Sequence, residues 1–307
     1  EGGHGHHTAS AILALEAFDA AADPAKFSWQ LKYTGTWKSK RIYWNTFNFG
    51  GTNTTSPNQL NMDVGLYNVL LAKNYGEIAA ESRSMHKSQG FGSARQRGSS
   101  LEYFKFLKGD SAKKDLFEFI NTSWKRVPAS AKTEALIAKC IKEFKYEMPG
   151  ASVKVLTEIY KSIAALNDKD EYTRYWKIQK LKETEQLILA CTGLWIEAQS
   201  ADYIAVAGEP LALSAQIIAR SSADVVLKKI NYAGVSDTTM NLALKTNELY
   251  TFKRRERTPP ELPYSTPYWL RNEHSEGLYA VNDPTLIGKA ENDAALNFTF
   301  QISVAGF

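Results

Sequence analysis

The 307-residue chain has little of what marks several common classes of protein. Its two cysteines, Cys140 and Cys191, are too few for a disulfide framework, so stability has to come from a packed core. No apolar run approaches the roughly 18 residues that cross a bilayer, and no basic-then-apolar signal peptide stands at Glu1. The sequence therefore predicts no transmembrane segment. The compartment stays open, because a mature exported protein would have lost its leader.

The chain also lacks a strong charge of either sign. A net charge of +4, from 37 Lys and Arg against 33 Asp and Glu, is too small an excess to indicate a nucleic-acid partner. The densest basic run, from Lys253 to Arg257, contains Glu256 and is followed by two prolines, which favours a solvated strand end. With 44% hydrophobic and 23% charged residues, the composition is that of a globular protein of two or three domains.

Several catalytic motifs are missing. The sequence contains no phosphate-binding P-loop, no nucleophile elbow and no paired Cys-x-x-Cys. Gly90-Phe-Gly92 is not a dinucleotide fingerprint, because the third glycine is misplaced and no strand leads into it.

Residues 1–97 show helices and strands in alternation. The pattern predicts a helix from Ala9 to just before Pro24 with Thr8 as its cap, a strand over 41–47, a short strand over 62–64 and a helix over 67–86. This alternation indicates an α/β layer. Because one or two strands cannot bury two helices, we expect the C-terminal part of an α/β domain, truncated on its N-terminal side, with an apolar patch left exposed.

Residues 98–202 read as a helical segment, because apolar residues recur at helical spacing. The three stripes are Leu136, Ile137, Cys140, Ile141 and Phe144; Leu156, Ile159, Tyr160 and Ile163; and Leu187, Ile188, Cys191, Leu194, Trp195 and Ala198. We interpret them as core, which makes both cysteines buried free thiols by default.

Residues 203–307 change to a period of two, which is typical of half-buried strands. The alternating apolar positions are Leu211, Leu213, Ala215, Ile217 and Ala219, and at the end of the chain Leu296, Phe298, Phe300, Ile302 and Val304. Several such runs, separated by turn residues, predict a β-sandwich domain.

Three of the five histidines lie between Gly3 and Thr8. His4 and His7 are three residues apart just before the first predicted helix, where a histidine can hold a metal and the helix N-terminus favours developing negative charge. His6 lies between them. A histidine-rich terminus is also typical of purification tags, although a tag is normally an unbroken run and does not lead into a capped helix. Catalytic zinc usually has three protein ligands, and no carboxylate lies at a suitable spacing, so the site is incomplete.

His86, Arg95 and Arg97 form a second candidate site. We expect His86 to end a helix, where the dipole favours its cationic form, and the glycines and arginines that follow suit a loop approaching an anionic or sugar ligand. A helix C-terminus followed by solvated arginines explains the same residues equally well. Both interpretations stay open.

Several short motifs resemble the PIG-L/LmbE-like zinc N-deacetylase family. Gly3-His-Gly-His-His-Thr-Ala-Ser10 resembles that family's second His-x-x-His motif, and residues 73–89, ending in His86-Lys-Ser-Gln89, resemble its closing helix. The strand expected over 41–47 falls where the family has one of its last strands. Large bacterial members carry a helical segment and a β-sandwich after the deacetylase domain. Three short motifs resemble that appended sandwich: Tyr268-Trp-Leu-Arg271, Gly277-Leu-Tyr and Leu286-Ile-Gly288. The order and spacing of these motifs carry the resemblance over most of the chain.

The resemblance implies a Rossmann-like α/β domain that hydrolyses an N-acetyl group, usually on a glucosamine-type sugar or glycoconjugate, with Zn²⁺ as cofactor. It implies His7 as a zinc ligand and His4 as the residue that stabilises the oxyanion or protonates the leaving amine. His6 stands where the family often has an aspartate. The family's first motif, His-Pro-Asp-Asp-Glu, supplies the other zinc ligands and the base, and it occurs nowhere in the chain.

We therefore expect a portion of a zinc-dependent N-deacetylase, with either a bound missing N-terminal segment or self-association, and the resemblance implies export. Two alternatives remain. The chain is a carbohydrate-binding or scaffold module, formed by the helical segment and the β-sandwich, with a vestigial, metal-free site, or it is a folded pseudoenzyme without metal. Trp44, Phe47 and Phe49 are able to stack on a sugar ring, but we favour a core role for them.

Overall fold

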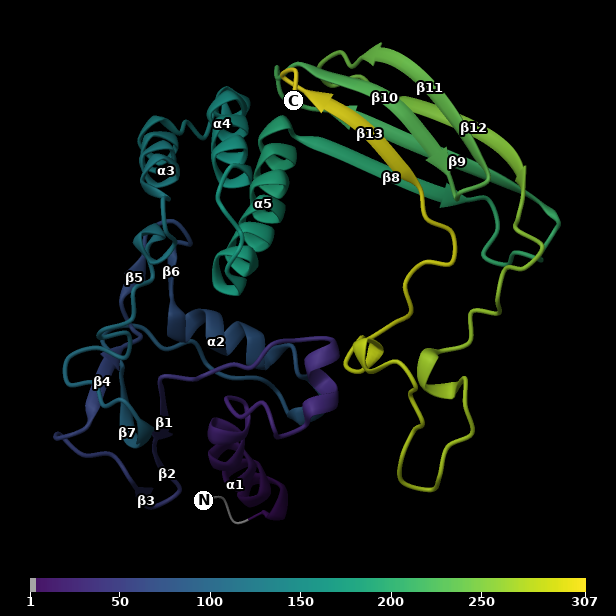
Figure 1. The fold of residues 1–307 in the computed structure, drawn as a ribbon. Helices are drawn as coiled ribbons and strands as arrows, with labels where there is room; N and C mark the ends of the chain where they lie inside the picture. Colours follow the sequence, from purple (N-terminus) through teal and green to yellow (C-terminus); the bar gives the residue numbers. More distant parts are fainter. Residues whose placement is uncertain (1–3) are drawn as a thin grey trace. The chain divides into compact units, whose positions relative to one another are not determined.

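The structure is a computed structural model that describes residues 4–307, with the side chain of Gln89 left out. The chain divides into two compact units, the first running through Asn121 and the second covering Thr122–Phe307. Both units combine helices with small antiparallel sheets (Figure 1). The helices expected within 98–202 and the strands expected within 203–307 therefore lie together in the second unit.

The first helix, α1 (Gly5–Ala20), begins earlier than the sequence predicts. His4 is its N-cap, and the His4 carbonyl accepts hydrogen bonds from the backbone N–H groups of His7 and Thr8 at 3.1 and 3.2 Å. The predicted Thr8 cap is therefore wrong, because Thr8 lies inside the first turn. None of the residues of α1 is buried, and Ile12 and Leu13 are 53% and 60% exposed. The apolar side expected for this helix faces no core within the described residues.

The main sheet of the first unit has the order β1-β7-β4 and is antiparallel throughout. Strands β1 (Arg41–Thr46) and β4 (Leu60–Asp63) confirm the two strands expected here. Its central strand β7 (Leu101–Gly109) lies in the segment expected to be helical, so that prediction is wrong for these residues. Tyr103, Phe104 and Phe106 favour a strand, and β7 pairs with a neighbour along both edges.

Helix α2 (Tyr75–Ser84) begins eight residues later than the predicted 67–86 helix. Asn74 and Glu77 form a capping box: the Asn74 side chain accepts from the Glu77 N–H at 2.7 Å, and Glu77 accepts from the Asn74 N–H at 3.1 Å. The residues before this cap form a short pair of strands, β5 (Tyr67–Asn68) and β6 (Lys73–Asn74). The other short elements of the unit are η1 (Ser28–Lys32), β2 (Asn48–Phe49), β3 (Thr52–Asn53) and η2 (Lys87–Gln89).

The second unit opens with helices that pack side by side (Figure 1). They are η3 (Trp124–Arg126), α3 (Ala131–Glu143), η4 (Pro149–Ser152), α4 (Val153–Ala164) and α5 (Glu171–Thr192). The predicted stripe of α4 is confirmed, since Leu156, Ile159 and Ile163 are buried. The third stripe is wrong beyond Thr192, because Gly193 ends α5 in the left-handed conformation at φ 60°.

Two three-stranded antiparallel sheets follow. The first has the order β12-β9-β8 and the second β11-β10-β13. Their strands are β8 (Leu194–Ser200), β9 (Pro210–Ala219), β10 (Val225–Tyr232), β11 (Ser236–Ala243), β12 (Tyr250–Arg257) and β13 (Thr299–Val304). The period-two pattern is confirmed in β9, where Leu211 and every second residue to Ala219 are buried. The last strand begins only at Thr299, so Leu296 and Phe298 precede it. The 3-10 turns η5 (Tyr268–Leu270) and η6 (Pro284–Leu286) lie in the long connection between β12 and β13.

One buried cluster joins these sheets to the helices. It contains Ile159 and Ile163 of α4, Ile217 of β9 and Leu227 of β10. Cys191 belongs to this core and Cys140 packs against it, and both thiols are free, as the sequence indicated. Burial raises the pKa of both thiols, which disfavours the reactive thiolate.

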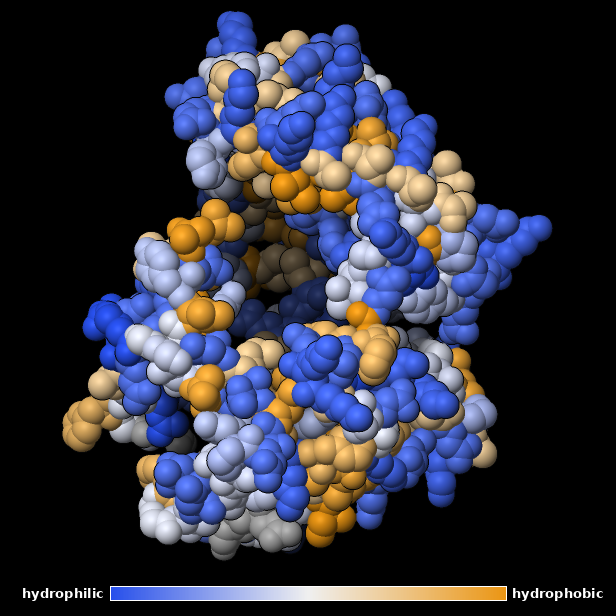
Figure 2. Space-filling view, turned by 90° about the vertical axis from the view of Figure 1, so that its left-hand side faces the viewer, coloured by the Kyte–Doolittle hydropathy of each residue, from blue (hydrophilic) through white to orange (hydrophobic). Residues whose placement is uncertain are grey.

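Many large apolar side chains are exposed at the surface (Figure 2). The longest such stretch in the first unit comprises Leu66, Tyr67, Val69, Leu70 and Leu71, all at least 53% exposed. An exposed apolar patch was expected from the small number of strands. Between residues 4 and 307, no helix is both long enough and apolar enough to cross a membrane.

Candidate functional site

The N-terminal histidines gather at the first turn of α1. His4 is the N-cap residue, in extended conformation, and His7 lies one turn along. Their rings are stacked with centroids 5.9 Å apart, close enough for one small ligand to contact both. The side chain of His4 does not cap the helix, so N–H groups of the first turn remain available to a negatively charged group. His4, His6 and His7 are all exposed.

These histidines are too few to form a catalytic zinc site by themselves. An imidazole nitrogen is a good zinc ligand. Because His4 and His7 are one helical turn apart, both rings are close enough to approach the same metal ion. Catalytic zinc, however, usually takes three protein ligands and a water. Across the described residues, no group of three or more His, Cys, Asp and Glu side chains is placed to hold a metal ion. Further along α1, Asp19 pairs with Lys108 instead.

His86 lies just beyond the end of α2. The helix ends at Ser84 with Met85 as its C-cap, and the His86 N–H donates to the Arg83 carbonyl at 3.0 Å. The ring is exposed, as expected for a histidine at a helix C-terminus. His86 does not join the N-terminal histidines in a group able to hold a metal, as far as the described residues extend.

Arg95 and Arg97 bind carboxylates of α2. Arg95 pairs with Glu81 at 3.0 Å and Arg97 with Glu77 at 2.9 Å. Glu81 also accepts from Lys73 at 2.7 Å, and this hydrogen bond is the main reason that the pKa of Glu81 is lowered. The pairs account for both arginines without a ligand, which favours the structural interpretation of this loop. Their side chains are still 54% and 70% exposed, so a substrate contact remains a prediction.

The aromatic residues that follow β1 are not core, contrary to the interpretation favoured above. Phe49 is 81% exposed and Phe47 is 42% exposed. The Phe47 ring contacts the edge of half-buried Trp44, with centroids 6.3 Å apart. These rings present apolar surface on which a sugar could stack.

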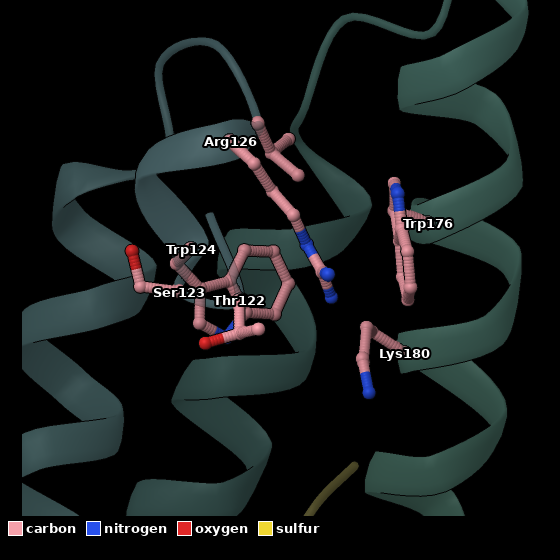
Figure 3. Close-up of a pocket in the computed structure, with 7 residues that line it drawn as sticks. Thr122, Ser123, Trp124, Arg126, Trp176 and Lys180 are labelled. Carbon is pink, nitrogen blue, oxygen red and sulfur yellow. The ribbon is translucent and has the colours of Figure 1, made fainter. Parts of the chain in front are cut away.

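A cavity in the second unit was not predicted from the sequence. It lies between η3 and α5, and Arg126, Trp176 and Lys180 line it (Figure 3). The only sequence signal is the spacing of Trp176 and Lys180, which puts both on one face of a helix. Arg126 belongs to a different element and meets them only in the folded structure, so no short sequence pattern indicates the contact.

No family model, no curated protein and no solved structure matches the chain.

Proposed function

We propose that the chain is a portion of a zinc-dependent hydrolase that removes an N-acetyl group from a glucosamine-type sugar or glycoconjugate. In this proposal the first unit is the C-terminal part of a Rossmann-like α/β deacetylase domain, and the two sheets of the second unit form a β-sandwich. Export is part of the same proposal. The observation that carries it is the pairing of the His4 and His7 rings at the N-terminus of α1.

The proposed roles follow the positions of the two rings. His7 holds the metal through one imidazole nitrogen. His4, stacked on it, donates a proton to the leaving amine nitrogen or a hydrogen bond to the oxyanion. The helix N-terminus supports this second role, since its free N–H groups favour negative charge nearby. His6 is exposed in the same turn, and we propose it as a further residue near the substrate.

The remaining ligands and the carboxylate base have no counterpart among the described residues. We propose that a segment carrying a His-Pro-Asp-Asp-Glu sequence, outside these 307 residues, supplies them. When bound, zinc in such a site would supply a water with a pKa lowered to about 7 and would polarise the amide carbonyl.

The test is acetate release from N-acetylglucosamine conjugates by the full-length protein that includes such a segment. We expect His7→Ala to abolish turnover and His4→Ala to lower kcat by about 10²- to 10⁴-fold, as for loss of a general acid. His274→Ala, which removes an exposed histidine of the second unit, is the matched control and should retain activity. Turnover that survives His7→Ala would overturn the proposal.

A metal-free binding or scaffold module is the second candidate. The absence of a third ligand among residues 4–307 favours it, as do the exposed rings of Phe47 and Phe49, which suit carbohydrate stacking. This candidate predicts that the 307-residue chain binds members of a glycan panel, and that Phe49→Ala weakens binding while His7→Ala does not. No binding across the panel would count against it.

A further inference from the structure

The cavity of the second unit has a positively charged lining. It encloses about 130 Å³ and is lined by Thr122, Ser123, Trp124, Arg126, Val127, Trp176 and Lys180. Two of these residues are cationic and none is acidic. Figure 3 shows the Arg126 guanidinium and the Lys180 side chain in the space between Trp124 and Trp176.

Arg126 is held in place by a stacking contact. Its guanidinium carbon lies 3.5 Å from the centroid of the Trp176 ring, a close cation–π stack. No ion pair in the part of the chain that the structure describes includes Arg126. Stacking uses only the face of the guanidinium, so the N–H groups, which lie in its plane, can still donate hydrogen bonds. That planar fork matches the oxygens of a carboxylate, sulfate or phosphate.

Lys180 adds a second positive charge one helical turn from Trp176. Its ammonium lies 5.6 Å from the Trp176 ring centroid. It pairs with Glu183 at 2.6 Å, but Glu183 is 56% exposed and does not line the cavity. One such pair uses one of the three ammonium donors, so Lys180 can still donate to a group in the cavity.

Trp176 also carries a buried donor without an acceptor. Its Nε1 is buried and has no hydrogen-bond partner among the described residues. Buried polar groups nearly always have a partner, so such an atom calls for an explanation. Figure 3 shows this nitrogen at the end of the indole that lies away from Lys180, so an anion held between Arg126 and Lys180 does not account for it, and the argument for the cavity depends on its two cationic side chains.

Several buried contacts anchor the backbone around the cavity. The hydroxyl of buried Ser130 donates to the Trp124 carbonyl at 2.6 Å, and Val127 is only 3% exposed. Asp170 caps the start of α5 by accepting from the Thr173 N–H at 2.8 Å. These contacts anchor the backbone segments that carry Arg126 and Trp176, and the Trp176 ring supports the Arg126 guanidinium, so part of the site is positioned before any ligand arrives.

We propose that this cavity binds the oxyanion group of a small ligand, a carboxylate, sulfate or phosphate, between Arg126 and Lys180. An apolar cavity of roughly 150 Å³ admits benzene, so 130 Å³ has room for one such group or for the edge of one sugar ring. The site uses no histidine and lies within the second unit, so it goes beyond the proposed deacetylase function and can fail or succeed independently of it.

The indole N–H signals of the 307-residue chain test the proposal directly. The chain has seven tryptophans, and ¹⁵N–¹H correlation spectra resolve each Nε1, with Trp176→Phe assigning the key signal. The probes are inorganic phosphate, inorganic sulfate and glucuronate at constant ionic strength, with glucose as a neutral control. We expect a saturable shift of the Trp176 signal with at least one anion and none with glucose. Tighter binding of glucuronate would indicate an acidic sugar, and tighter binding of phosphate or sulfate a tetrahedral anion.

Substitutions decide whether the shift reports this site. Arg126→Gln should weaken binding about tenfold or more, as for loss of a charge-assisted hydrogen bond, and Lys180→Gln should weaken it to a smaller extent. Lys182→Gln, an exposed lysine on the same helix, should leave binding unchanged. Thermal unfolding of each variant checks its fold, and Lys180→Gln serves as the test if Arg126→Gln is unstable. No saturable shift with any of the three anions, or binding unaffected by Arg126→Gln and Lys180→Gln in folded protein, would overturn the proposal.

Discussion

The Asp63 carboxylate connects two segments of the first unit. One oxygen accepts from the backbone N–H groups of Gly65 and Ser100 at 2.8 and 2.9 Å, and the other accepts from the Ser99 hydroxyl at 2.7 Å. These bonds favour the ionised form, and the bond from Ser100 does most to lower the pKa of Asp63. Asp63 thus connects the end of β4 to the residues just before β7.

This arrangement predicts an acid-sensitive contribution to stability. Because the folded-state pKa is below the unfolded value, the contribution is complete above about pH 4 and is lost as the pH falls through the lowered pKa. Asp63→Asn should therefore lose less stability than the wild type between pH 7 and pH 3, measured by urea unfolding at each pH. Glu261→Gln, which removes an exposed carboxylate of the second unit, should behave like the wild type.

Among secondary-structure elements, α2 depends most visibly on its cap. Asn74 is 4% exposed, and its amide nitrogen also donates to the Gln96 carbonyl at 3.2 Å. Asn74→Ala removes these bonds together with half of the capping box. We expect it to lower the free energy of unfolding by about 1–2 kcal/mol and to speed hydrogen exchange in α2. Ser82→Ala, on the exposed side of the same helix, should change neither, and a similar loss in both variants would contradict the capping argument.

The end of α5 depends on a glycine. Gly193 has φ 60°, and a β-carbon placed there would lie 2.9 Å from the Arg220 β-carbon. Gly193→Ala should therefore destabilise the protein by at least about 1–2 kcal/mol, the cost of a left-handed conformation for a residue with a side chain. Thermal unfolding measures the loss. An unchanged melting temperature would show that the turn between α5 and β8 does not need this conformation.

These elements show which parts of the fold could be predicted. Apolar periodicity located α4 and β9, because both bury one regular face of side chains. Periodicity did not show where α2 begins, since this depends on a side-chain cap, or that α5 ends at Gly193. It also missed β7, whose conformation comes from pairing with β1 and β4, which are distant in sequence.

In the molecule as a whole, the second unit has the larger shared core. Ile163 of α4 is 1% exposed and belongs to the cluster that joins the helices to both sheets. Ile163→Ala should cost about 2–5 kcal/mol, the usual range for such a truncation, and should speed hydrogen exchange in peptides from residues 122–307. Leu187→Ala, at a side chain that is 53% exposed, is the control and should cost much less. Equal losses would contradict the assignment of Ile163 to the core.

The candidate sites differ in how far the sequence could indicate them. His4 and His7 are close in sequence, so their spacing marked them as candidates, although it did not show that their rings stack. Arg126 and Trp176 come from separate elements and meet only through packing, so no local pattern marked the cavity. The pairing of Arg95 and Arg97 with carboxylates of α2 could not be seen in the sequence for the same reason.

The zinc content of the purified protein tests the central proposal most directly. Elemental mass spectrometry should find about one zinc per polypeptide in the full-length protein that carries the His-Pro-Asp-Asp-Glu segment, as is typical of a single catalytic site. The ratio should fall to near zero in His7→Ala and stay near one in His274→Ala. A wild-type protein that contains the segment but no zinc, or a His7→Ala variant that keeps its zinc, would contradict the account.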